Sequence, residues 1–371
     1  MMVMTRFPVH MTPDQSQRRR AAAQRRRVRR RVMAIAALAL AIGAALVVMA
    51  LAKTHDAHGS TSASTHRGHR SGHATRLAPV AAPARSPIGL SLGKPPLALE
   101  GIGDPAQDPV HAAFPEPPRG GLLFNLDTGQ VLWQRNPYTR LRIASLTKMM
   151  TALLTVESAP PDAPVLVSRQ AVDMPGSKVG VLPLGRHVRL ETMLYGLLLP
   201  SGNDAAVALA EHVSGSVSRF VTRMNAEAAH LGMGCTHYTS PSGYYDQYNF
   251  SCAADLALLA HVDLQQPRIA SITRTYTASL PFPIKGGHLY LYNNNPLLIY
   301  HYPGLTGLKT GETLAAGRCL VATATRDGVS LGVVLLHSPD PGTQAAYLLN
   351  RGFEGVYRQP PVPEPPIPAG A

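Results

Sequence analysis

The pattern of apolar and polar positions divides the 371-residue chain into parts of different character. An uncharged apolar run fills residues 32–52, and residues 53–112 show no apolar periodicity because histidine, serine, glycine and proline dominate them. Strand-like alternation and helical spacing begin near residue 113 and continue to residue 358, and residues 359–371 are proline-rich again. We therefore predict a single folded domain at residues 113–358.

Within residues 113–358, strand patterns lie at the two ends and helical patterns lie between them. Residues 121–136 contain two apolar runs around a turn at 127–129, and residues 318–337 repeat this arrangement around 326–328, so both stretches predict hairpins. Helix formers predominate in five stretches, at residues 144–157, 191–199, 204–213, 218–233 and 343–357. These patterns predict an α+β fold, with an antiparallel sheet assembled from N- and C-terminal segments and covered by a helical cluster.

The run at residues 32–52 is long enough to cross a membrane, since 21 residues rising about 1.5 Å each span a roughly 30 Å hydrocarbon core. Nine arginines lie within residues 18–31, directly before it. This arrangement predicts a basic cytoplasmic segment at residues 1–31, a single-pass transmembrane signal-anchor in the cytoplasmic membrane, and a folded domain outside the cytoplasm. Ala50-Leu51-Ala52 has the form of a signal-peptidase site, so secretion after cleavage is the alternative.

Residues 53–112 are predicted to be a disordered linker rich in histidine, serine and proline. Loose metal binding by its histidines is the alternative to a solvated spacer. The proline-rich residues 359–371 form a predicted tail without amphipathic character.

The net charge of +13 belongs to the N-terminal region. Residues 1–112 carry 16 Lys and Arg against 5 Asp and Glu, whereas residues 113–358 carry 19 against 16. The predicted domain thus has a net charge of only +3, so we expect no nucleic-acid partner.

Three cysteines lie in the predicted domain, which we expect to be exported to a compartment that tolerates disulfides. Cys235 and Cys252 are close enough in sequence to pair, but the sequence does not decide whether they do. Cys319 lies in an apolar strand-like run and is expected to be a small buried residue. No cysteine or histidine spacing typical of a metal site occurs, and we predict none.

Ser145 and Lys148 lie one helical turn apart in an apolar helix, so the lysine amine can reach the serine hydroxyl. A serine becomes a strong nucleophile when a base removes its proton, and apolar neighbours make a lysine easier to deprotonate. A helix cap beside a surface lysine is the structural alternative for this short pattern.

Two further groups of polar residues lie downstream. Ser201 and Asn203 lie between two predicted helices, where they either face a site or cap the second helix. Lys309 and Gly311 share one face of a predicted strand, with Thr310 between them. We expect the missing side chain of Gly311 to leave that face open to a substrate backbone.

Together these groups form S-x-x-K, S-x-N and K-T-G motifs in the order and contexts used by penicillin-recognising serine acyltransferases. Longer stretches carry the same resemblance, at residues 142–154, 195–216, 220–233, 236–246, 251–260 and 307–328. Over residues 114–357 the chain resembles the low-molecular-mass penicillin-binding proteins, and among them the D-alanyl-D-alanine carboxypeptidases of serine peptidase family S11. The resemblance implies a β-lactamase/transpeptidase-like domain.

The resemblance also implies roles for individual residues. Ser145 would be the nucleophile, Lys148 its base, and Ser201 the hydroxyl that passes a proton to the departing D-alanine. Other members of the site would bind the substrate or its oxyanion: Asn203, Lys309, Thr310 and Gly311 for the substrate, and the backbone N–H groups of Ser145 and Glu312 for the oxyanion. The expected partners are peptidoglycan stem peptides ending in D-Ala-D-Ala and, as covalent inhibitors, β-lactams, with no metal or organic cofactor.

Two departures from the family pattern bear on efficiency and substrate preference. Glu312 follows K-T-G where the family usually has an aromatic residue or histidine, and residues 337–349 lack a substrate-binding arginine found in some members. A D,D-endopeptidase that cuts cross-links is the main alternative activity. A β-lactamase is less favoured, since no glutamate lies between Glu227 and Glu312, and so is a non-catalytic wall-binding protein, since the motif residues are present.

Overall fold

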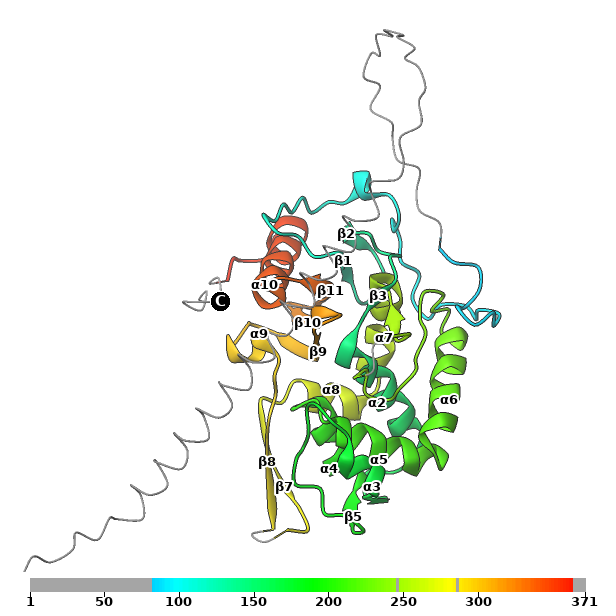
Figure 1. Cartoon of the computed structure of the whole chain (residues 1–371). Coiled ribbons are helices and arrows are strands. Elements are labelled where there is room, and N and C mark those ends of the chain that lie inside the picture. Colours follow the sequence, from blue (N-terminus) through cyan, green and yellow to red (C-terminus); the bar gives the residue numbers. More distant parts are fainter. Residues whose placement is uncertain (1–81, 245–246, 285–286, 363–371) are drawn as a thin grey trace, which may run out of the picture. The chain divides into compact units, whose positions relative to one another are not determined.

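The computed structural model describes residues 82–244, 247–284 and 287–362, with the elements labelled in Figure 1. The basic segment, the apolar run at residues 32–52 and most of the proline-rich tail lie outside these residues, so their predicted roles stay predictions. Among the described residues, the helices are all too short or too polar to cross a bilayer.

A five-stranded antiparallel sheet has the order β2-β1-β11-β10-β9 and joins the two ends of the domain, as predicted. Its strands are β1 (Gly120–Asn125), β2 (Val131–Arg135), β9 (Leu305–Thr313), β10 (Gly317–Arg326) and β11 (Val329–Ser338). Both predicted hairpins are confirmed, and their turns use the left-handed backbone of Gly129 in one and of Asp327 and Gly328 in the other. Three two-stranded ribbons complete the strands: β3 (Leu141–Arg142) with β6 (Phe250–Ser251), β4 (Pro164–Leu166) with β5 (His187–Arg189), and β7 (Thr277–Pro281) with β8 (His288–Tyr292).

Helices lie on both faces of the sheet (Figure 1). Along β1, Leu122 and Phe124 pack into the helical cluster, whereas Leu123 between them packs on the opposite face with Leu348. The larger helices are α2 (Thr147–Ser158), α4 (Leu190–Leu198), α5 (Asn203–Ser214), α6 (Val217–His230), α7 (Ala253–Gln265) and α10 (Pro341–Asn350). Shorter elements are α3 (Arg169–Asp173), α8 (Pro267–Thr273), α9 (Pro296–Ile299), the 3-10 turns η1 (Pro105–Gln107) and η2 (Ala144–Leu146), and the π-helical turn η3 (Arg351–Val356).

The predicted helices correspond to α2, α4, α5, α6 and α10, with two differences. The last one is divided into α10 and η3. The sequence did not predict α7 or the short helices α3, α8 and α9, although Leu256 and Leu259 of α7 are fully buried in the helical cluster.

The prediction of a disordered linker reaching residue 112 is wrong for residues 82–112. Leu97 and Val110 are buried in the two hydrophobic clusters. Backbone hydrogen bonds join Val131 N to Glu100 O at 2.9 Å and Val110 N to Leu132 O at 2.9 Å. A few well-spaced apolar residues and paired backbone groups thus attach this proline-rich segment to the domain.

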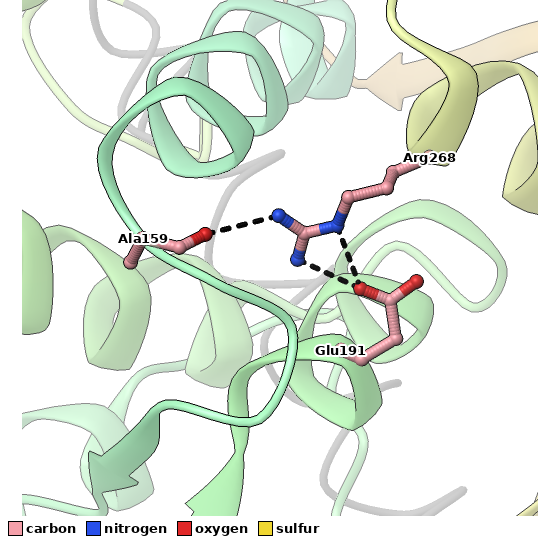
Figure 2. Close-up of polar contacts among 3 residues, drawn as sticks. All are labelled: Ala159, Glu191 and Arg268. Carbon is pink, nitrogen blue, oxygen red and sulfur yellow. Dashed lines mark hydrogen bonds and ion pairs between the residues drawn. The ribbon is translucent and has the colours of Figure 1, made fainter.

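An ion pair joins the helices around α2 (Figure 2). Arg268 of α8 donates two hydrogen bonds to Glu191 Oε2, from Nε at 3.0 Å and from Nη2 at 2.7 Å. Its Nη1 donates to Ala159 O, at the end of α2, over 3.0 Å. Glu191 lies in the first turn of α4, where the helix dipole favours a carboxylate. One guanidinium therefore connects α2, α4 and α8.

Cys235 and Cys252 form a disulfide, with 5.7 Å between their Cα atoms. It joins the segment after α6 to the residue preceding α7. Asp255 in the first turn of α7 accepts from Cys235 N at 2.7 Å and from Thr236 Oγ1 at 2.6 Å, while burial raises the pKa of its carboxyl to about 7. Cys319 is buried in β10, as expected.

Candidate active site

Ser145 lies in the 3-10 turn η2, which leads directly into α2, so the predicted helix start is confirmed. Ala144 before it has φ 46°, a left-handed conformation that costs energy for a residue with a Cβ. Thr147 Oγ1 donates to Ala144 O at 2.7 Å and accepts from Asn249 Nδ2 at 2.7 Å. These bonds hold the strained turn that carries the Ser145 hydroxyl.

Lys148 is fully buried, and its amine contacts three oxygen atoms. Nζ lies 2.8 Å from Ser145 Oγ, 2.7 Å from Asn203 Oδ1 and 2.9 Å from Ser242 O. Burial, and secondly the nearby Lys309, hold the pKa of Lys148 well below its usual value, against the opposing effect of Asp204. The structural alternative of a surface lysine is therefore wrong.

These contacts orient a neutral lysine toward the serine. A neutral amine has two N–H donors and one lone pair, and the carbonyl oxygens of Asn203 and Ser242 can only accept. They take the two N–H groups, so the lone pair faces Ser145 Oγ. In this state Lys148 is placed to accept the hydroxyl proton of Ser145.

Asn203 and Asp204 position the site, and Asp204 Oδ1 also accepts from Ala205 N, in the first turn of α5, at 2.8 Å. Asn203 Nδ2 donates to Pro175 O at 2.8 Å, which fixes its amide so that Oδ1 faces Lys148. Asp204 is buried and accepts from Val179 N at 2.9 Å and Gly180 N at 3.0 Å. Together the two side chains hold the segment after α3 against the start of α5.

Ser201 faces the same pocket as Ser145 and has φ 64°. Its side chain is 6% exposed, and its Oγ has no hydrogen-bond partner among the described residues. A strained backbone and an unsatisfied hydroxyl are costly, and both are typical of a residue held ready for a ligand.

Lys309 and Thr310 reach the site from β9, at the edge of the sheet. Lys309 is 1% exposed, its Nζ donates to Thr310 O at 2.9 Å, and burial lowers its pKa to about 7. Thr310 lines the pocket. Below about pH 7 this edge therefore offers a buried positive charge beside a hydroxyl.

Gly311 lines the pocket and also lies close to the turn that carries Ser145. A Cβ at this position would lie 2.8 Å from Ile143 O and 3.1 Å from Ser145 N. The missing side chain therefore lets β9 lie directly against the turn that carries Ser145. This close approach fixes the strand relative to the nucleophile.

The pocket has a volume of about 390 Å³ and is lined by Ser145, Ser201, Thr310 and Glu312 together with residues that the sequence did not single out. Among these is Arg318 of β10, which pairs with Glu312 across the strands, and its Nε lies 4.0 Å from Glu312 Oε1. Both side chains are exposed, so their attraction is weak. The Glu312 carboxylate at the rim thus lies near a cation, and an arginine does line the pocket although residues 337–349 contain none.

Two site components gave no signal in the sequence motifs. Ser242 contributes only its backbone carbonyl, and any residue type provides one. Arg318 could have been found only from the register of β9 with β10, which places it opposite Glu312. In contrast, the structure brings together every motif residue in or beside one pocket.

This fold and this Ser–Lys arrangement define a serine hydrolase of the DD-peptidase and β-lactamase-like class. Residues 119–340 match the family model described as D-alanyl-D-alanine carboxypeptidase. The chain belongs to this family.

Individual relatives agree with this assignment. D-alanyl-D-alanine carboxypeptidase DacF of Bacillus subtilis is 36% identical over 250 residues, which cover 65% of this chain and 64% of that protein. A D-alanyl-D-alanine endopeptidase of Pseudomonas aeruginosa is 34% identical over 220 residues, covering 58% of this chain and 69% of its own length. The crystal structure of the Streptomyces K15 DD-transpeptidase has a TM-score of 0.61 at 30% identity and covers 66% of this chain and 99% of its own.

Proposed function

We propose that this enzyme is a serine D-Ala-D-Ala carboxypeptidase that removes the terminal D-alanine from peptidoglycan stem peptides. The observation that carries the proposal is the buried Lys148 amine, 2.8 Å from Ser145 Oγ and oriented by two other acceptors. Family membership supports the substrate class.

The proposed reaction has two halves. Ser145 Oγ attacks the carbonyl between the two D-alanines while Lys148 takes its proton, and the backbone N–H groups of Ser145 and Glu312 stabilise the oxyanion. Ser201 donates its hydroxyl proton to the departing amine and regains a proton from Lys148, so Lys148 becomes neutral again. Water then attacks the acyl-enzyme and gives a proton to Lys148, which passes it to Ser145 Oγ as the ester bond breaks. The shortened peptide leaves with a new carboxylate, and Ser145 and Lys148 return to their starting states.

The substrate's terminal carboxylate is proposed to lie against β9. Lys309 supplies positive charge and Thr310 a hydroxyl donor, while Asn203 orients both Lys148 and the peptide. Because β-lactams mimic a D-Ala-D-Ala terminus and carry a carboxylate, we expect them to acylate Ser145 as covalent inhibitors.

We also propose that residues 32–52 anchor the enzyme in the cytoplasmic membrane, with the catalytic domain outside the cytoplasm. The uncharged apolar run and the preceding arginines support this topology. Secretion after cleavage near Ala52 is the alternative, and mass spectrometry of the mature N-terminus separates the two.

Labelling with a fluorescent penicillin tests the nucleophile. We expect the wild type to form a covalent adduct and Ser145→Ala to form none. Ser177→Ala is a matched control because Ser177 lines the same pocket but is not assigned to the reaction. If Ser145→Ala retains a covalent label, the proposed nucleophile is wrong.

Two substrates then separate the activities. Release of one D-alanine from a free pentapeptide indicates a carboxypeptidase. Cleavage of cross-linked dimers without action on the pentapeptide indicates a D,D-endopeptidase, and transfer of the acyl group to an added amine indicates a transpeptidase. Only the first outcome supports the proposal.

A further inference from the structure

The ribbon formed by β7 and β8 presents one exposed face that carries two tyrosines. Along β8, Leu289 and Leu291 are buried, whereas Tyr290 and Tyr292 between and after them are 68% and 63% exposed. Residues two apart on a strand point to the same side about 6.6–6.8 Å apart, so the two rings form a row. Contiguous exposed aromatic side chains are typical of a binding surface.

Among the described residues of the two strands, this face carries no Asp, Glu, Lys or Arg side chain, and beside the tyrosines it holds polar residues and Pro281, which pairs with His288. Across the ribbon, Ser279 pairs with Tyr290 and Thr277 pairs with Tyr292. The ring of His288 lies 6.4 Å from that of Tyr290 and is tilted against it by 32°. We call Thr277, Ser279, His288, Tyr290 and Tyr292 the tyrosine stripe.

The tyrosine stripe leads into the active-site pocket. Asn293, directly after Tyr292, is buried, and its Nδ2 donates to Thr273 O and Thr275 O at 3.1 Å each. The next residues, Asn294 and Pro296, line the pocket with Ser145. The stripe is therefore continuous along the chain with residues that line the pocket, and Figure 1 shows the ribbon extending away from α9 as an arm.

The chemistry of the stripe favours an uncharged sugar polymer. Tyrosine rings offer flat apolar faces to the C–H groups of a pyranose ring, and their hydroxyls, with those of Ser279 and Thr277, can hydrogen-bond sugar hydroxyl and acetamido groups. An anionic membrane surface would instead require clustered lysines or arginines. The five-residue length of β8 is sufficient to lie along more than one sugar ring.

We propose that the tyrosine stripe binds the glycan strand of peptidoglycan while the pocket holds the stem peptide attached to that strand. The inference rests on the proposed function for its substrate class. It makes the enzyme selective for the glycan-borne pentapeptide over the free peptide.

The test compares the full-length wild type with Tyr290→Ser/Tyr292→Ser on two substrates with the same pentapeptide, one free and one carried on uncross-linked glycan strands. We expect the variant to raise the KM for the glycan-borne substrate roughly ten-fold and to leave kcat and all constants for the free peptide unchanged. Tyr290→Phe/Tyr292→Phe keeps the rings and should retain the wild-type KM. Tyr248→Ser, at a tyrosine that is 60% exposed on another loop, is the matched control.

Other outcomes overturn the inference. Equal losses on both substrates would mean that the ribbon supports the pocket, and no loss on either would mean that the stripe does not touch the glycan. A loss of binding to phosphatidylcholine vesicles, without any glycan effect, would assign the stripe to a membrane.

A binding assay separates this inference from the proposed function. Ser145→Ala protein should sediment with peptide-free glycan strands, and the added tyrosine substitutions should abolish this sedimentation. If the wild type fails to cleave the free pentapeptide while glycan binding still depends on the tyrosines, the proposed function is wrong and the inference that the stripe binds glycan is supported. If the tyrosine substitutions do not change sedimentation with glycan, the inference about the stripe is wrong and the proposed function is unaffected.

Discussion

Two buried lysines, Lys148 and Lys309, lie in or beside the site, and the charge of Lys309 affects the protonation of Lys148. Burial is the main cause of both lowered pKa values, and for Lys148 the charge of Lys309 is the second. The proposed reaction needs them in different states, since Lys148 must be neutral to accept a proton and Lys309 charged to hold a carboxylate. At the residue scale, activity is therefore expected in a limited pH range.

The loss of activity on the alkaline side of that range should follow the deprotonation of Lys309. Its pKa is about 7, so raising the pH through this value removes the positive charge. We expect kcat/KM for a pentapeptide with a free carboxylate to fall above about pH 7. A substrate whose terminal carboxylate is amidated has no charge to hold and should not show this fall. Identical pH profiles for the two substrates would contradict the assigned role of Lys309.

Asp263 in α7 should reduce stability at neutral pH. Its carboxyl is fully buried, both oxygens lack a partner within the described part of the chain, and burial raises its pKa well above the usual value. The folded state thus holds a proton that the unfolded state has lost, so this residue makes stability fall as pH rises above about 4.

Asp263→Asn is neutral at every pH and should therefore remove that dependence. We expect it to be more stable than the wild type by about 1–3 kcal/mol at pH 8, and by less at pH 5, in urea unfolding. Asp173→Asn is the control, since the Asp173 side chain is 64% exposed. A wild-type advantage at pH 8 would contradict the prediction.

The sequence predicted the identities of the reacting residues better than it predicted their surroundings. The motifs that contain Ser145, Ser201 and Lys309 are defined by particular side chains, which the sequence shows directly. The structure places these side chains in or beside one pocket. The Ser242 carbonyl and the close approach of Gly311 to Ser145 N depend on backbone positions, which no residue pattern encodes.

At the element scale, the ion pair of Arg268 with Glu191 holds together helices that surround α2 (Figure 2). About a quarter of each side chain is exposed, so the pair is only partly screened by water. Arg268 also satisfies a carbonyl at the end of α2. The pair therefore supports the helix that carries the base without touching the site.

Arg268→Ala should lower the free energy of unfolding by about 1–3 kcal/mol, because it leaves Glu191 and the Ala159 carbonyl without their partner. Thermal unfolding measures this change. Arg169→Ala is the matched control, since Arg169 lies 4.0 Å from Asp173 in an exposed pair and should change stability by about 0–1 kcal/mol. Equal losses for the two variants would show that burial of the pair is not the cause.

Hairpins were predictable because their turns have a local signature, whereas α7 was not predicted as an element. Asp127-Thr128-Gly129 and Arg326-Asp327-Gly328 specify turns within three residues. Helix α7 is apolar on nearly all sides because it packs between the sheet and α2, so it lacks an amphipathic period.

At the scale of the whole molecule, the folded domain begins earlier than the sequence predicted. Composition alone made residues 82–112 resemble a linker, because proline and glycine interrupt any regular period. Leu97 and Val110 are nevertheless buried, and the segment pairs its backbone with the β2 region. Such sparse contacts become visible only when the partner surface is known.

Truncation tests this boundary. A chain that starts at residue 82 should keep the thermal stability of the full-length protein, whereas one that starts at residue 113 should be destabilised by several kcal/mol. The expected loss follows from two buried apolar side chains at about 1.5–3 kcal/mol each and from the hydrogen bonds of the segment. Equal melting temperatures for the two truncated chains would restore the linker prediction.

The Cys235–Cys252 disulfide makes the geometry of the site depend on the redox state of its surroundings. It lies at the base of the segment that provides the Ser242 carbonyl, one of the three oxygens around Lys148. Reducing compartments keep such cysteines as thiols, so a chain retained in the cytosol would lack this covalent support. We expect protein refolded with a reductant to react more slowly with penicillin than oxidised protein, and Cys235→Ser/Cys252→Ser to be slow under both conditions. Full activity would then require a compartment in which the disulfide can form.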